Sequence, residues 1–329
     1  MIAQTRTLII INPASARARR AWPMIKATLT ENRISFDVYE TTHAGDATRR
    51  TRAALHDGCQ IVAIVGGDGT LSEAAAGFFE SDEAGNHAAS HLPSAINEDA
   101  ALAILPAGTG DDFARGLAGG RAPLESWLET FIAYYRHDDG CGARMIDVIH
   151  GRVSEGERGF ICLNVATIGL GAEVAARVAS QGNTLRRLPG EARFVSAAFG
   201  ALAAWRERQV RVTVDDSEVI EGRSNLIAVA NGIYAGGGMM FAPHARTDDG
   251  LIDLVLTRDL TRLTILKELS RIRRGEHLVN PKVRVVHAAR VRVETDTTRD
   301  ALLVEADGNV RGHTPAQFQI MPGALRVVL

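Results

Sequence analysis

The sequence predicts an N-terminal α/β domain with a parallel sheet, followed by a C-terminal, mainly antiparallel β-sandwich domain. First, a chain of 329 residues is long enough for two domains. Second, buried strands and helices alternate up to about residue 140, which is typical of βαβ units. Third, the strands beyond that point are short, alternating and separated by turn residues. We therefore predict domains at residues 1–140 and 141–317.

The N-terminal domain is predicted from apolar runs separated by helical patterns. Three such runs are typical of strands buried on both faces of a parallel sheet: Thr7–Ile11, Ile61–Val65 and Ala101–Leu105. An alternating strand is predicted at 34–40, and helices are predicted at 17–32, 46–56, 71–80 and 124–135. Asn12, Thr41 and Gly66 follow three of these strands, and the carboxyl ends of parallel strands form the ligand-binding edge of such sheets. We expect these three residues to lie along one rim.

The C-terminal domain is predicted from shorter elements. The predicted strands are 145–150, 159–165, 210–214, 226–230, 251–256, 283–293 and 301–304. The predicted helices are 172–178, 193–205 and 263–274. Turn residues separate most of the strands, and this pattern favours an antiparallel sandwich.

Composition excludes several classes of protein. A net charge of −2 argues against a general nucleic-acid binder. Cys59, Cys141 and Cys162 are widely spaced and contain no CxxC pair, as in reduced thiols of a cytosolic protein. No signal peptide or membrane-spanning segment is evident, so we expect a cytoplasmic protein that meets membranes only at their surface, peripheral to the inner face. P-loop, zinc-protease, serine-hydrolase and dinucleotide fingerprints are missing.

The most informative stretch is the strand Ile61–Val65 with the glycine-rich turn that follows it. Gly66, Gly67 and Gly69 allow a phosphate to approach the main chain, where the N–H groups of a helix start are unsatisfied. Asp68 would repel a phosphate directly, but a carboxylate suits Mg²⁺ bound between the two. A purely structural Gly-Asp-Gly turn is the alternative.

A second glycine-rich turn follows Ala101–Leu105. It contains Thr109, whose hydroxyl could face the same phosphates, although a structural turn explains it equally well. Acidic residues recur in later turns at Asp147, Asp249 and Asp307. Each is more often a solvated turn residue than a site residue, but a site needing a metal ligand and a base would use several of them.

The motifs taken together resemble the diacylglycerol kinase catalytic-domain superfamily, which includes bacterial diacylglycerol kinases and sphingosine kinases. The residues that carry the resemblance are, in order, GGDGT-Leu-Ser-Glu, PAGTGDDFAR, NG-YAGGGM-APHA-DDG-L and D-G, and they extend from Asn12 to Asp307. GGDG alone is shared with NAD kinases and phosphofructokinases, whereas the combination is far more specific. The resemblance implies an ATP site between the two domains and a C-terminal strand, about 318–329, that returns to the first domain.

The resemblance also implies individual site residues. The nucleotide contacts would be Asn12, Pro13, Ala14, Ser15, Ala16, Thr41, Gly66, Gly67, Asp68, Gly69, Thr70, Leu71, Ser72 and Thr109. Asp68 would engage the ATP phosphates through Mg²⁺. A structural Mg²⁺ would be bound by the carboxylate of Asp249 and the carbonyls of Arg246 and Leu251, with Asp147 acting through water. Asp307 lies in the motif that accepts the proton of the lipid hydroxyl.

Three positions depart from the pattern of the superfamily. Asp111 stands where Asn is usual, and its charge should weaken ATP binding unless a cation or Arg115 offsets it. Ser72 replaces Asn, which keeps a small hydrogen-bonding side chain. Asn309 replaces the Glu of the D-G-E motif and cannot accept a proton, so either Asp307 would act alone or the enzyme would be slow.

The predicted function is an ATP- and Mg²⁺-dependent lipid kinase that phosphorylates a hydroxyl of a lipid such as diacylglycerol or a sphingoid base. One alternative is a catalytically impaired nucleotide- or lipid-binding protein, motivated by Asn309 and Asp111. Another is a GGDG-type kinase of a soluble acceptor such as NAD. The expected partner is a lipid at a membrane surface, and the sequence leaves open whether the chain forms a homodimer.

Overall fold

The computed structural model describes residues 6–81, 92–136, 142–153, 159–181 and 190–329 and, within them, all side chains except those of 190–194 and 298. Cys141 and the expected domain boundary at residue 140 lie outside the described residues. The chain divides into two compact units. Among the described residues, the first unit holds everything up to Val148 together with Pro322–Leu329, and the second holds Ile149–Met321.

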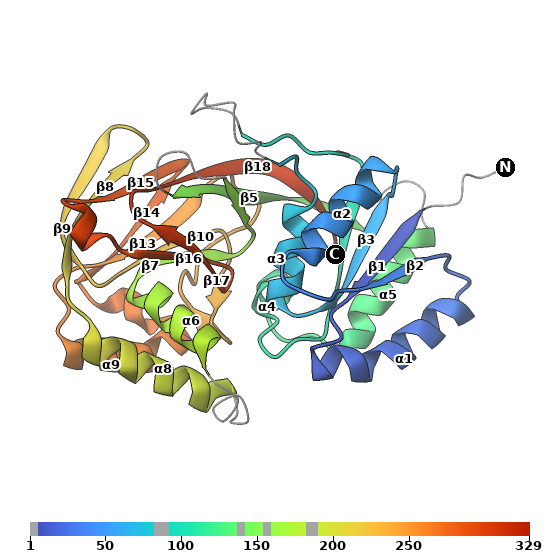
Figure 1. Cartoon of the computed structure of the whole chain (residues 1–329), viewed down its shortest axis with the longest axis horizontal. Coiled ribbons are helices and arrows are strands. Elements are labelled where there is room, and N and C mark those ends of the chain that lie inside the picture. The colour runs from blue at the N-terminus through green and yellow to red at the C-terminus, as the bar shows by residue number, and fades with distance from the viewer. Residues whose placement is uncertain (1–5, 82–91, 137–141, 154–158, 182–189) are drawn as a thin grey trace. The chain divides into compact units, whose positions relative to one another are not determined.

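The first unit is built on a parallel sheet in the order β2-β1-β3-β4, to which the end of β18 is added (Figure 1). The strands are β1 (Thr7–Ile11), β2 (Asp37–Glu40), β3 (Ile61–Gly66), β4 (Ala101–Pro106) and β18 (Ala316–Val328). The helices are α1 (Ala16–Glu31), α2 (Asp46–His56), α3 (Asp68–Ala76), α4 (Asp112–Leu117) and α5 (Leu124–Arg136). Every residue of β1 and β3 is buried, as their continuous apolar runs predict.

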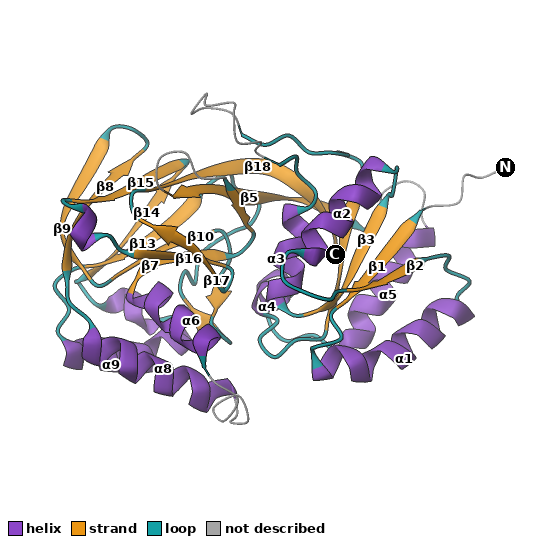
Figure 2. Ribbon diagram, in the orientation of Figure 1, coloured by secondary structure: helices purple, strands orange, loops and turns teal. Residues whose placement is uncertain are grey.

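Two pairs of helices cover this sheet (Figure 2). The Arg136 guanidinium of α5 donates to Oδ1 of Asn32 at the end of α1, 2.7 Å away. The Thr48 hydroxyl of α2 donates to the Glu73 carbonyl of α3, also 2.7 Å away. Because βαβ crossovers are right-handed, α1 lies on one face of the sheet and α2 and α3 lie on the other. The strand order therefore changes direction between β1 and β3, and ligands of such sheets bind at this point.

The second unit is a sandwich of two antiparallel layers. One layer has the order β14-β13-β10-β7-β16-β17. Its strands are β7 (Val165–Gly169), β10 (Leu226–Ala230), β13 (Ile252–Thr257), β14 (Val283–Ala288), β16 (Leu303–Ala306) and β17 (Asn309–His313). The other layer contains β6 (Phe160–Cys162), β8 (Arg208–Val214), β9 (Glu218–Ser224) and β15 (Arg290–Thr295). It also contains β5 (Ala143–Val153) from Ile149 onward and β18 up to Met321, because both of these strands continue into the first unit.

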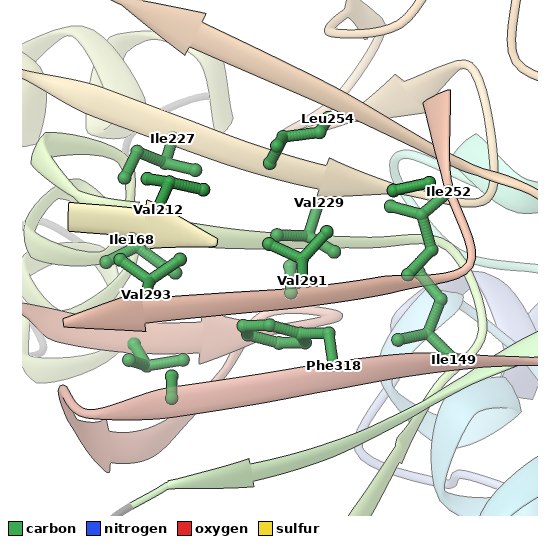
Figure 3. Close-up of a cluster of buried hydrophobic side chains, with 14 of the residues drawn as sticks. Ile149, Ile168, Val212, Ile227, Val229, Ile252, Leu254, Val291, Val293 and Phe318 are labelled. Carbon is green, nitrogen blue, oxygen red and sulfur yellow. The ribbon is translucent and has the colours of Figure 1, made fainter. Parts of the chain in front are cut away.

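Apolar side chains from both layers fill the space between them (Figure 3). Ile227 and Leu254 come from one layer, and Val212, Val291 and Phe318 come from the other. The remaining elements of this unit are β11 (Tyr234–Ala235), β12 (Met239–Met240), α6 (Leu170–Ser180), α8 (Gly190–Ala204), α9 (Arg262–Arg271) and the 3-10 turns at 272–274, 276–279 and 298–300. Within the described ranges, none of the helices combines the length and apolar composition needed to cross a bilayer.

The predicted fold class is confirmed. Several predicted strands differ in extent, such as 34–40, which is Asp37–Glu40, and two of them are divided in the structure. The predicted strand 283–293 is two strands, β14 and β15, which pair in different layers and are separated at Ala289. The predicted strand 159–165 is interrupted at Leu163 and Asn164, where the main chain bends between β6 and β7. In both places partners distant in the sequence, rather than the local pattern, determine where a strand ends.

Candidate functional site

The first glycine-rich turn joins β3 to α3. Gly66 ends the strand, Gly67 is the N-cap of the helix, and Asp68 is its first residue. The helix therefore starts before the predicted Leu71, because Asp68 and Gly69 already adopt helical geometry in its first turn. A Cβ built on Gly69 would have no atom within 4 Å, so the main chain there is open to an approaching group. An acidic residue in the first helical turn is also favoured by the helix dipole.

The second glycine-rich turn joins β4 to α4. Asp111 has a φ of +51°, a left-handed conformation that Asp tolerates better than most residues. Its Oδ1 accepts the Gly108 N–H at 2.8 Å, so this carboxylate is directed at its own turn. Burial raises the pKa of Asp111, the Gly108 N–H lowers it, and the charge of Asp68 raises it again. The carboxylate thus stabilises the turn while adding negative charge beside Asp68.

The two glycine-rich turns touch through their main chains. A Cβ on Gly108 would lie 2.4 Å from the Cα of Gly67, a distance that no real pair of atoms adopts without movement. Asp68 Oδ1 accepts the N–H of Phe113 at 3.1 Å, and Phe113 lies in the first turn of α4. The Asp68 carboxylate therefore lies in the first turn of α3 and also caps the start of α4, where both helix dipoles favour negative charge.

The turn after β1 adds further contacts to this arrangement. Ser15 is the N-cap of α1, and its hydroxyl donates to the Ala107 carbonyl at 3.0 Å. The Arg17 guanidinium donates to the Gly108 carbonyl at 2.8 Å. These bonds connect α1 to the second glycine-rich turn. Arg17 was not among the predicted site residues, although it directly follows the predicted stretch Asn12–Ala16.

Asn12, Thr41 and Gly66 lie at the carboxyl ends of neighbouring parallel strands. The Thr41 N–H donates to the Ile11 carbonyl at 2.9 Å, and Asn12 Nδ2 donates to the Thr70 hydroxyl at 3.1 Å. These residues thus occupy one edge of the sheet.

Not every predicted nucleotide contact is exposed at this edge. The side chains of Thr70, Leu71 and Ser72 are buried, whereas Gly69 and Thr109 are exposed. The Thr109 carbonyl accepts a hydrogen bond from Arg121 at 3.0 Å. At this edge a ligand can therefore reach Gly69 and Thr109, but not the buried side chains of the three residues after Gly69.

Asp46 is a further acidic residue at this edge and was not among the predicted site residues. It is buried at the start of α2 and accepts the Thr42 N–H at 2.8 Å, the Tyr39 hydroxyl at 3.0 Å and the Arg49 guanidinium at 2.8 Å. The Thr42 N–H is the main reason why the pKa of Asp46 is lowered to about 2, against the effect of burial. In the sequence, the local pattern that could have indicated Asp46 was an acidic residue at the start of a predicted helix.

Asp307 and Gly308 form the turn of the hairpin between β16 and β17. Both have positive φ values, +49° and +84°, as a tight Asp-Gly hairpin turn requires. The Asp307 carboxylate accepts three main-chain N–H groups, from Leu163 at 2.7 Å, Asn164 at 3.0 Å and Val165 at 3.3 Å. These bonds fasten the hairpin turn to the bend between β6 and β7.

Glu305 lies two residues before Asp307 and was not among the predicted site residues. Its carboxylate accepts the Thr167 hydroxyl at 2.7 Å and the Gly308 N–H. Burial raises the pKa of Glu305 to about 7, against the lowering effect of both hydrogen bonds. An acidic residue within the apolar run at 302–306 was the available signal. Asn309 donates through Nδ2 to the Asp307 carbonyl at 3.3 Å.

The motif at Asn231 and Gly232 packs against the same bend. Both N–H groups donate to the Asn164 carbonyl, at 2.8 and 3.0 Å. A Cβ on Gly232 would lie 2.0 Å from Oδ1 of Asn164, so only glycine fits there. The glycine of this motif thus serves packing around the bend.

The residues predicted for a structural Mg²⁺ lie in both units. Asp249 Oδ1 accepts the Leu251 N–H at 3.1 Å, and the Arg246 guanidinium donates to Asp248 at 3.2 Å. Asp147, in the first unit, accepts the Gly323 N–H at 2.7 Å. Among the residues with described placement, no three His, Cys, Asp or Glu side chains are grouped to bind a metal.

Two family descriptions match the chain. Residues 6–137 match "Diacylglycerol kinase catalytic domain", and residues 166–329 match "YegS C-terminal NAD kinase beta sandwich-like domain". A protein of Xanthomonas axonopodis named "Probable lipid kinase YegS-like" is 30% identical over 304 residues, which cover 92% of this chain and 89% of that protein. A protein of Mycobacterium tuberculosis named "Diacylglycerol kinase" is 28% identical over 294 residues, covering 87% and 82%.

Solved structures show the same fold. A diacylglycerol kinase from Bacillus anthracis superposes with a TM-score of 0.66 at 19% identity, covering 100% of this chain and 98% of that one. An NAD kinase from Archaeoglobus fulgidus, solved in complex with ATP, gives a TM-score of 0.50 at 12% identity, covering 98% and 93%.

Proposed function

Because the chain belongs to the diacylglycerol kinase catalytic-domain family of lipid kinases, we propose that it transfers the γ-phosphoryl group of ATP to a hydroxyl of a lipid such as diacylglycerol or a sphingoid base. One observation carries this proposal. Two glycine-rich turns meet at the carboxyl edge of a parallel sheet, and the Asp68 carboxylate lies where they touch. Such an edge, with the main chain of Gly69 exposed in the first turn of α3, suits a polyphosphate.

The nucleotide would lie along the edge that carries Asn12, Thr41 and Gly66. We propose contacts from the residues implied by the resemblance, with the main chain around Gly69 and Thr109 facing the phosphates. The exposure of these two residues, and the open space around Gly69, support this placement.

The donor set also fits Mg²⁺, which prefers one or two carboxylates together with phosphate oxygens. We propose that Asp68 engages the ion bound to the phosphates. For a structural ion we propose Asp249 with the carbonyls of Arg246 and Leu251, and Asp147 through water. The ion at Asp68 would neutralise charge on the phosphates, which together with positioning is what phosphoryl transfer requires.

In the transfer step, the lipid oxygen forms a bond to the γ-phosphorus, and the bond from that phosphorus to the β–γ bridging oxygen breaks. The hydroxyl proton passes to Asp307, and ADP leaves with the bridging oxygen. The three N–H groups that hold Asp307 support this role, because positioning supplies much of the rate in such reactions. The lipid would be met at the surface of a membrane.

The experiment compares Asp68→Asn with Asp68→Ala, using Asp37→Asn on the exposed strand β2 as a control. Asn keeps an oxygen for the Phe113 N–H but lacks the charge, so we expect a folded protein that has lost Mg²⁺-dependent ATP binding. Ala should lose the cap of α4 as well. Labelled ATP and a total lipid extract should give a labelled lipid with the wild type and with Asp37→Asn.

Full activity of Asp68→Asn would refute the role of the carboxylate. If the wild-type protein binds ATP but labels no lipid, the result would favour a catalytically impaired binding protein. The presence of Asn309 in place of Glu is the observation behind this alternative. Labelling of NAD in place of lipid would identify a kinase of a soluble acceptor.

A further inference from the structure

Glu305 is a carboxyl group enclosed by the protein, with only 6% of the residue exposed. Its neighbours Val304 and Ala306 are fully buried core residues. Burial of a carboxylate is unfavourable unless hydrogen bonds compensate for lost hydration. A residue of this kind next to the Asp307–Gly308 turn therefore requires an explanation beyond packing.

The bonds of Glu305 connect two elements that are distant in the sequence. One carboxylate oxygen accepts the Thr167 hydroxyl of β7 at 2.7 Å, and the other accepts the Gly308 N–H of the hairpin turn. Asp307, in the same turn, is fastened separately to the bend before β7. The turn is thus held from two sides by two carboxylates.

We propose that Glu305 is a positioning residue for phosphoryl transfer: in its ionised form it fixes the Asp307–Gly308 turn, and with it the Asp307 carboxylate, in the reactive orientation. This inference rests on the proposed function, in which Asp307 accepts the hydroxyl proton. A hydrogen bond to an ionised acceptor is about twice as strong as a neutral one, so protonation of Glu305 loosens its bond to Gly308.

The groups around Glu305 determine the pH at which it becomes ionised. Burial raises the pKa of Glu305 to about 7, and the charge of Asp307 adds to this while Arg311 of β17 opposes it. The neighbouring Cys162 thiol is buried and donates to Asp307 at 3.5 Å. Helix α6, which packs on β16, carries two charged residues, Glu173 and Arg177. Neither is hydrogen-bonded to Glu305. Glu305 should therefore change from its protonated to its ionised form near neutral pH.

The test measures kcat/KM for lipid phosphorylation between pH 5.5 and 8.5 (a range of about 1.5 units on either side of the transition). The wild type should gain activity as pH rises through about 7. Glu305→Gln, which keeps an acceptor for Gly308, should lose this transition and fall roughly fivefold to tenfold below the wild-type plateau, mainly in kcat. Thr167→Val removes a donor to the ionised form, so the midpoint should move up by about one pH unit. Glu294→Gln, on β15, should match the wild type.

Three outcomes would overturn the inference. A wild-type transition that persists in Glu305→Gln would assign it to another group. An unchanged midpoint in Thr167→Val would show that the bond to Thr167 does not act on Glu305, and this variant keeps the test decisive if Glu305→Gln fails to fold. Wild-type protein that labels no lipid would instead remove the proposed function on which the inference rests.

Discussion

Replacing Gly108 by Ala tests whether the two glycine-rich turns must touch. The added Cβ would lie 2.4 Å from the Cα of Gly67 and 2.6 Å from Oδ1 of Asp111. Ordinary contacts begin at 3.4 Å, so the turns must separate by about 1 Å. Overpacking of this kind costs about 1–3 kcal/mol. The separation should also weaken the 3.1 Å bond from the Phe113 N–H to Asp68.

Gly69→Ala is the matched variant in the first turn. Its Cβ would meet no atom within 4 Å, and the residue is already in a helical turn. Replacing a helical glycine by alanine stabilises a protein by about 0.5–1 kcal/mol. If phosphate approaches the main chain here, the same methyl group should weaken ATP binding roughly tenfold. The two variants should therefore separate stability from binding.

The assays are urea unfolding followed by circular dichroism and titration calorimetry with Mg²⁺ and ATP. Gly108→Ala should lose both stability and affinity, and Gly69→Ala should lose affinity alone. Gly120→Ala, outside both turns and with no atom within 4 Å of its Cβ, should change neither. Wild-type stability in Gly108→Ala, or wild-type affinity in Gly69→Ala, would refute the reasoning.

Three further predictions follow from individual carboxylates. Asp111→Asn keeps an acceptor for the Gly108 N–H and removes a charge beside Asp68, so calorimetry should show ATP binding that is roughly threefold tighter. Weaker ATP binding by this variant would contradict the prediction. Asp111→Ala also removes the acceptor, so it should lower the free energy of unfolding by about 1–2 kcal/mol. Asp46, with its pKa lowered to about 2 from 3.8, contributes stability that is present above pH 4 and is lost as pH falls through about 2. Acid titration followed by fluorescence should therefore show a smaller loss of stability in this range in Asp46→Asn, and identical curves would exclude the contribution. The effect of pH at Glu305 has the opposite sign, because the pKa of this carboxyl group is raised from 4.5 to about 7. As the pH rises through this range, the wild type should lose about 3 kcal/mol of stability relative to Glu305→Gln. Urea unfolding of both proteins at pH 5 and pH 8 measures this loss. The same stability difference between the two proteins at both pH values would contradict the raised pKa of Glu305.

The sequence was sufficient for the parts of the fold that local patterns determine. The buried runs at Ile61–Val65 and Ala101–Leu105 are strands of a parallel sheet, and the helix at 46–56 has the predicted bounds. Apolar runs between turn residues carry this information because each strand of such a sheet is buried on both faces.

Features that depend on distant partners could not be predicted. The bend at Leu163 is capped by a carboxylate that is 144 positions later in the chain, so periodicity at 159–165 suggests one strand. The burial of Glu305 depends on its neighbours in β7 and β17. The bond from the Phe113 N–H to Asp68 likewise joins two turns, and neither turn alone indicates that Asp68 caps a second helix.

The pairing of β18 with β4 has a consequence for how the protein is made. Arg326 and Val327 pair with Ala101 and Leu102 and thereby cover the outer edge of β4. A ribosome adds residues 322–329 only after it has made the whole of Ile149–Met321. Until then the nascent first unit exposes the unpaired N–H and C=O groups of β4, as an open sheet edge does. Its native sheet is thus completed after translation of the second unit, although its own helices and first strands emerge first.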